Sequence, residues 1–77
     1  LALAMECAKT GGTAPAILSA ANEEAVALFL GGRIGFNRIY DCVAGALARI
    51  EIKRAPGLPD ILDADARARI DVKEHYS

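Results

Sequence analysis

Three residues of this chain belong to the types that most often act as catalysts or metal ligands: His75, Cys7 and Cys42. Catalysis requires a nucleophile, an acid or base, or a metal, held together in a pocket. His75 lies two residues from the end of the chain, and the sequence indicates no partner that would orient it as a base. One histidine and two cysteines do not have the spacing of a zinc site. We therefore predict no catalytic, cofactor-binding or metal-binding residue in this chain.

The two cysteines are 35 positions apart, and each falls on an apolar helical stripe. A small secreted domain that is held together by disulfides usually has four or more cysteines. We therefore expect Cys7 and Cys42 to be buried, reduced thiols, as is usual in a cytosolic protein.

Two other segments resemble ligand sites. Asp60, Asp63 and Asp65 lack the glycine and the final glutamate of a calcium loop, so we expect them to be acids at a helix N-terminus. Gly11-Gly12 and Thr13 precede a helical pattern but lack the lysine and the strand of a phosphate-binding loop. We predict that the glycines end one helix and that the Thr13 hydroxyl caps the next.

Ser19, Asn22 and Glu23 form a polar cluster, because spacings of three and four residues place them on one helix face beside an apolar stripe. Polar groups in such a position need hydrogen-bond partners. The cluster is either a hydrogen-bonded network that fixes the helix register, which we favour, or a contact for a ligand or another domain.

The composition indicates a small helical domain. The chain has 77 residues, of which 53% are apolar and 25% charged, with a net charge of -1 and many alanines, the best helix formers. No basic stripe that could bind nucleic acid is present, and no apolar run approaches the roughly 20 residues that span a bilayer. Because residue 1 is Leu1 rather than methionine, we expect the chain to begin inside a larger protein or to have been trimmed.

The apolar periodicity predicts an all-α fold, a small up-and-down bundle of three to four helices with an aliphatic core. Pro15 suits the first turn of the second helix, and Asn37 is a suitable N-cap for the third. Ile34 and Phe36 are expected to plug the end of the bundle, ahead of that third helix. The expected helices cover residues 1–9, 14–30, 38 onward and 63–76.

The region before the last helix is predicted to be a loop. Pro56 and Pro59 forbid a continuous helix there, and residues 60–62 are expected to form at most one turn. Asp63 and Asp65 each precede an arginine by four residues, a spacing that supports a helix from 63 onward.

Two stretches resemble the C-terminal part of the 1-deoxy-D-xylulose 5-phosphate reductoisomerase family. Residues 11–23 read GGTAPAILSAANE and residues 27–36 read ALFLGGRIGF, close to the Gly-Gly-Thr-Ala-Pro, Leu-Asn-Ala-Ala-Asn-Glu and Gly-Arg-Ile-Gly-Phe segments of that family. Residues 63–67 are similar to its Asp-Ala-x-Ala-Arg segment. Two positions depart from the pattern: Ser19 replaces an asparagine, and Glu24 replaces a β-branched apolar residue.

The resemblance implies a three-domain enzyme that converts 1-deoxy-D-xylulose 5-phosphate to 2-C-methyl-D-erythritol 4-phosphate for isoprenoid synthesis, using NADPH and a divalent metal such as Mg or Mn. It further implies an N-terminal NADPH-binding domain and a central catalytic domain, which carries the metal ligands and the contacts of a homodimer. Both would precede Leu1, with residues 1–77 as the C-terminal helical bundle. The implied location is the bacterial cytoplasm, or a plastid in a plant or alga.

Two functions are compatible with these observations. The first is a structural domain that supports the catalytic domain, has no activity alone, and docks through Ser19, Asn22 and Glu23. The second is a free-standing helical module that binds a partner helix in an apolar groove. An enzyme in its own right is excluded by the lack of suitable chemical groups.

Overall fold

The computed structural model describes residues 2–76, which form four helices and no strand. The helices are α1 (Ala2–Thr10), α2 (Ala14–Leu30), α3 (Arg38–Arg49) and α4 (Leu58–Tyr76). The all-α prediction is confirmed, and the predicted bounds of the second helix agree with α2. Leu1, where the first helix was predicted to begin, and Ser77 lie outside the described residues.

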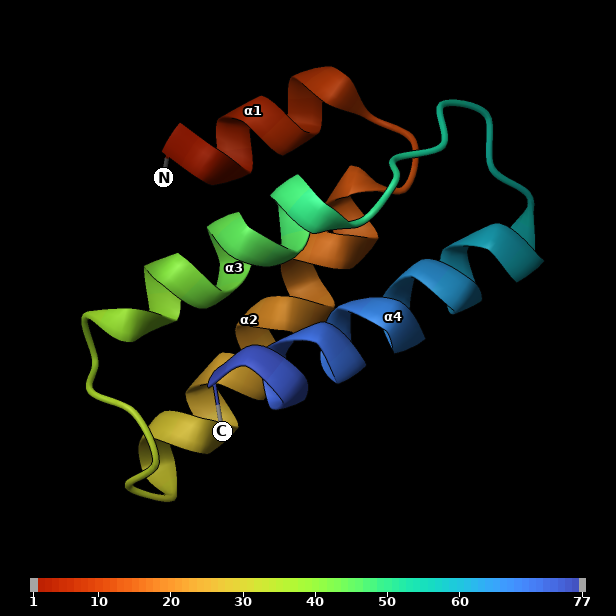
Figure 1. Ribbon diagram of the computed structural model, residues 1–77. Helices are drawn as coiled ribbons and strands as arrows, with labels where there is room; N and C mark the ends of the chain where they lie inside the picture. The colour runs from red at the N-terminus through yellow and green to blue at the C-terminus, as the bar shows by residue number, and fades with distance from the viewer. Residues whose placement is uncertain (1, 77) are drawn as a thin grey trace.

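Consecutive helices run in opposite directions, as expected for an up-and-down bundle (Figure 1). α2 is the central helix and packs against α1, α3 and α4. α1 and α3 lie on the same side of α2 and run in the same direction, so the start of α1 lies near the first half of α3 (Figure 1). Within residues 2–76 no helix is long and apolar enough to cross a membrane.

The core consists mainly of small side chains. Its two largest fully buried apolar residues are Ile17 and Val72. Around them lie buried alanines and two other small residues: Ala20, Ala21, Ala25, Cys42, Val43, Ala46, Ala64 and Ala68. Small side chains let helix backbones approach closely, so the interior is filled without aromatic residues. The predicted aliphatic core is confirmed.

Two left-handed glycines form the turn between α1 and α2. Gly11 and Gly12 have φ values of 70° and 59°, and Gly11 N donates to the carbonyl oxygen of Cys7 at 2.9 Å, which closes the end of α1. Pro15 lies in the first turn of α2, as predicted.

The predicted cap of α2 by Thr13 is wrong. Its hydroxyl makes no capping bond to α2 and instead accepts from Lys53 N at 2.9 Å, while Thr13 N donates to the Lys53 carbonyl oxygen at 2.9 Å. Thr13 is 1% exposed, so its hydroxyl satisfies a backbone group of a segment 40 residues away. This pair of bonds ties the α1–α2 turn to the segment that follows α3.

The connector between α2 and α3 also differs from the prediction. Asn37 precedes α3 but makes no side-chain capping bond, because its backbone is already in the helical region at φ -68° and ψ -13°. Phe36 is 73% exposed and does not plug the bundle, and its ring meets that of Phe29 edge-on at 5.5 Å. Ile34, by contrast, packs against the core as expected.

α4 begins at Leu58, five residues before the predicted start. Oδ2 of Asp60 accepts from Gly57 N at 3.0 Å, so a side chain in the first turn satisfies a backbone donor just before the helix. Pro59 falls in that first turn, where its missing N–H is no disadvantage. A local cap therefore moves the start of the helix ahead of the second proline.

We expect Gly12→Ala to destabilise the chain far more than Gly11→Ala. Both glycines have positive φ, which costs an alanine about 1–2 kcal/mol. A Cβ at Gly12 would in addition collide with the Lys53 carbonyl oxygen and approach Arg54 Cα to 2.9 Å. A Cβ at Gly11 would have no such neighbour within 4 Å. Urea unfolding of both variants measures the difference, and equal losses of stability would contradict the close packing of the turn.

Candidate functional site

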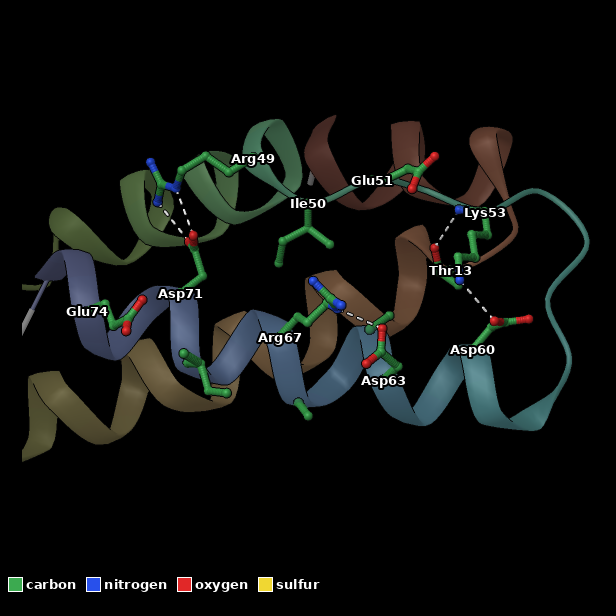
Figure 2. A pocket seen from close by; sticks show the side chains of 13 residues that line it. Thr13, Arg49, Ile50, Glu51, Lys53, Asp60, Asp63, Arg67, Asp71 and Glu74 are labelled. Carbon is green, nitrogen blue, oxygen red and sulfur yellow. Dashed lines mark hydrogen bonds and ion pairs between the residues drawn. The ribbon is translucent and has the colours of Figure 1, made fainter.

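A cleft of about 720 Å³ separates α4 from the end of α3 and the segment after it (Figure 2). Charged side chains of both signs line it, and Figure 2 shows three ion pairs among them, Arg49 with Asp71, Lys53 with Asp60 and Arg67 with Asp63. The residues that carry the charges are Arg49, Glu51, Lys53, Asp60, Asp63, Arg67, Asp71 and Glu74.

The strongest pair joins α3 to α4. Nε and Nη2 of Arg49 donate to Oδ1 and Oδ2 of Asp71, both at 2.8 Å, and Asp71 is only 9% exposed. The two hydrogen bonds from Arg49 lower the pKa of Asp71 and outweigh the opposing effect of burial. The carboxylate therefore stays ionised and fixes the distance between the two helices.

Two aromatic side chains extend this pair at the end of α4. Tyr76 Oη donates to the Asp41 carbonyl oxygen at 3.2 Å, and the Arg49 guanidinium lies 5.6 Å from the Tyr76 ring centroid. His75 Nδ1 lies 2.9 Å from the carbonyl oxygen of Asp71 and 3.4 Å from its Oδ1. Because a carbonyl oxygen only accepts, Nδ1 is the protonated nitrogen in this contact.

Sequence reasoning missed this set of contacts. No partner was predicted for His75, although its spacing of four from Asp71 was a signal of a shared helix face. The partnership of Asp71 with Arg49, 22 residues earlier, had no local signal. Together the contacts join the Arg49 guanidinium, the Asp71 carboxylate and two backbone carbonyl oxygens at the α3–α4 interface.

The other pairs in the cleft lie nearer the start of α4. Lys53 Nζ contacts Asp60 Oδ1 at 3.1 Å, and the bonds to Asp60 from Gly57 N and from Lys53 lower the pKa of that carboxyl. Arg67 Nε lies 2.7 Å from Asp63 Oδ2, which confirms one of the two predicted i,i+4 pairs. The cations of this cleft are thus bonded to carboxylates of the same chain.

The second predicted i,i+4 pair belongs to a cluster between α2 and α4. Arg69 Nε contacts Asp65 at 2.8 Å, and the same guanidinium reaches Glu23 at 3.3 Å and Glu24 at 3.5 Å. Glu24 also lies 3.9 Å from Lys73 Nζ, and its side chain is 17% exposed. The charge at this position, which departs from the family pattern, therefore has two cationic partners on α4.

The structure brings together only part of the predicted polar cluster. Ser19 and Asn22 are exposed on α2 and line a second groove, formed with α1 and α3. Glu23 is also exposed but points to the opposite side, toward Arg69 of α4. The interpretation of the three residues as a network or a docking face stays a prediction.

The remaining candidates are buried thiols or groups that bond within the chain. Cys7 and Cys42 are free and buried, as predicted, and burial raises the pKa of both thiols. The backbone N–H of Thr13, after the glycine turn, donates to the Lys53 carbonyl oxygen and is therefore already bonded within the chain. Within residues 2–76, no three or more histidine, cysteine, aspartate or glutamate side chains gather as metal ligands could.

Comparison with known proteins gives one consistent family. A family profile described as the DXP reductoisomerase C-terminal domain matches residues 1–71. The 1-deoxy-D-xylulose 5-phosphate reductoisomerases of Aromatoleum aromaticum and Bacillus subtilis are 54% and 48% identical over 69 residues, 90% of this chain and 17% and 18% of those proteins. That of Ralstonia pickettii is 51% identical over all of this chain and 19% of its own length. The chain thus spans less than a fifth of these relatives. No solved structure matches it.

We expect Asp71→Asn to lower the melting temperature (Tm) at neutral pH, with a difference from the wild type that shrinks as the pH falls below about 4. The folded-state pKa of Asp71 is depressed, so its contribution to stability is present above the unfolded pKa and is lost as the pH falls through the folded pKa. Thermal unfolding between about pH 7 and pH 2 measures this.

Asp63→Asn is the matched control for this series. Its partner Arg67 and Asp63 itself have more than half of their side-chain surface exposed, so its loss should change the Tm much less. Equal effects of the two variants, or an Asp71→Asn difference that does not change with pH, would show that the pair with Arg49 does not stabilise the bundle.

Proposed function

The chain belongs to the family of DXP reductoisomerase C-terminal domains, and on that basis we propose that it is the structural helical domain of a 1-deoxy-D-xylulose 5-phosphate reductoisomerase. The observation that carries this proposal is the match of the family profile to residues 1–71. The reductoisomerases that match are more than five times as long as the segment they share with this chain. In this proposal residues 1–77 form one domain and support a catalytic domain of the same polypeptide.

The whole protein would carry out the activity for which its relatives are named. It would rearrange and reduce 1-deoxy-D-xylulose 5-phosphate with NADPH and a divalent metal such as Mg or Mn, as a homodimer, in the bacterial cytoplasm or in a plastid. We assign NADPH, metal and substrate to the preceding domains. The donors of this chain do not fit these groups, because Asp60, Asp63 and Asp71 of the cleft are bonded to cations of the chain and no cluster of metal ligands forms within residues 2–76.

The contacts between the helices favour a structural role for this domain over a catalytic one. Two long-range ion pairs join helices to each other: Asp71 with Arg49 between α4 and α3, and Glu24 with Arg69 between α2 and α4. Such contacts hold a bundle in one geometry, which is what a neighbouring domain needs from a support. Docking through Ser19, Asn22 and Glu23 is part of the proposal, with Ser19 and Asn22 on the groove side of α2 and Glu23 on the side of α4.

The test is an amide-resolved NMR spectrum of the 77-residue chain, alone and then with NADPH and Mg²⁺. We expect dispersed peaks that neither addition moves, because the bundle has its own core and the cofactor-binding groups lie in other domains. NADPH oxidation with substrate should be measurable for the full-length protein and absent for this chain.

Peaks that shift on a defined surface would mean that this domain contacts cofactor or metal, and would contradict the assignment of these groups to the preceding domains. A full-length protein without the reductoisomerase activity would contradict the proposal as a whole and would favour the free-standing interaction module.

A further inference from the structure

An apolar groove of about 620 Å³ lies where the first turn of α1 meets α2 and the first half of α3. Leu3 of α1, Leu18 of α2 and Val43 of α3 contribute to its walls. Two large side chains on its rim are left in solvent, since Phe36 is 73% exposed and Tyr40 61%. Exposed apolar side chains that adjoin a groove indicate a surface that another group covers.

The position of α1 points to the group that covers this groove. α1 runs beside α3 in the same direction (Figure 1). One side of α1 shares a smaller depression with Ala44 and Ala48 in the second half of α3; its residues there are Leu3, Glu6, Cys7 and Thr10. The first half of α3 lines the larger groove, to which α1 contributes only Leu3 and Ala4 from its first turn. A polypeptide that enters α1 from upstream therefore arrives at the edge of the groove.

The rim of the groove suits a peptide backbone. Ser19, Asn22 and Asn37 lie along it, and hydroxyl and amide side chains both donate and accept hydrogen bonds, as the N–H and C=O groups of a peptide require. Glu23 is turned away to Arg69, so its charge does not face the groove. A neutral polar rim around an apolar floor fits an extended segment with apolar side chains.

We propose that the segment connecting this domain to the preceding one passes through the groove and buries at least one large apolar side chain against Leu18, Ile39 and Val43. This inference rests on the proposed function, in which most of the polypeptide precedes this chain. The stretch of α3 from Arg38 to Val43 is about 8 Å long at 1.5 Å per residue, so two or three extended residues cross it. A segment tethered at the groove edge also loses little translational freedom on binding.

The test compares the 77-residue chain with a version that restores about 15 of its own upstream residues, several times the length needed to cross the groove. We expect the restored residues to raise the Tm by at least about 4 °C, the effect of burying one large apolar side chain in a chain of this size. Tyr40→Lys, which places a charge on the groove rim, should abolish this rise.

Leu62→Lys on α4 is the matched control, because Leu62 is also 61% exposed but lies outside the groove. In the 77-residue chain each variant should change the Tm by no more than about 4 °C, as surface substitutions do. In the extended chain Leu62→Lys should keep the rise. No rise in the extended chain, or a rise that survives Tyr40→Lys, would overturn the proposal.

Hydrogen exchange of residues 39–43 in the full-length protein separates this proposal from the proposed function. We expect exchange there to be slowed equally in the full-length protein and in the extended chain. Slow exchange in the full-length protein alone would mean that a folded domain covers the groove. That result would overturn the role of the segment and leave the supporting function in place.

Discussion

The close approach of α3 and α4 to α2 is the constraint on which the rest of the structure depends. Ala20, Ala21 and Ala25 of α2 are fully buried, and they meet Ala46 of α3 and Ala68 of α4, which are also fully buried. A larger side chain at any of these positions would push the helices apart, and the buried interior of a protein has little free volume to absorb it. The short side chains thus set the width of the bundle.

Alanine contacts define distance but discriminate poorly between neighbouring helix registers, since each alanine offers the same small surface. Register is fixed by polar bonds between segments far apart in sequence. The two bonds between Thr13 and Lys53 position the α1–α2 turn, and the bidentate pair of Arg49 and Asp71 positions α4 on α3. These contacts are directional, so they specify a single arrangement in a core that would otherwise tolerate sliding.

The accuracy of the sequence-based predictions follows the range of the interactions involved. The bounds of α2 were predictable because glycines and a proline mark its ends and its apolar period is regular. The i,i+4 pairs of α4 were predictable for the same local reason. The Thr13 hydroxyl was predicted to accept from the first N–H groups of α2, but it accepts from Lys53 N, 40 residues away in the sequence. Apolar periodicity does not indicate contacts between residues so far apart in the sequence. The partners of Glu24 on α4 were missed for the same reason, and so was the part of the candidate site formed by α3 and α4.

The two buried thiols make different openings of the bundle distinguishable. Cys7 is 5% exposed and belongs to α1, the shortest helix, whereas Cys42 is fully buried on α3 beside the central helix. A thiol reagent reacts with a buried cysteine only after the surrounding structure opens, and raised thiol pKa values slow any reaction in the closed state. Labelling of Cys7 therefore reports detachment of α1, while labelling of Cys42 reports separation of α3 from α2. The molecule thus carries two native probes of local and global opening.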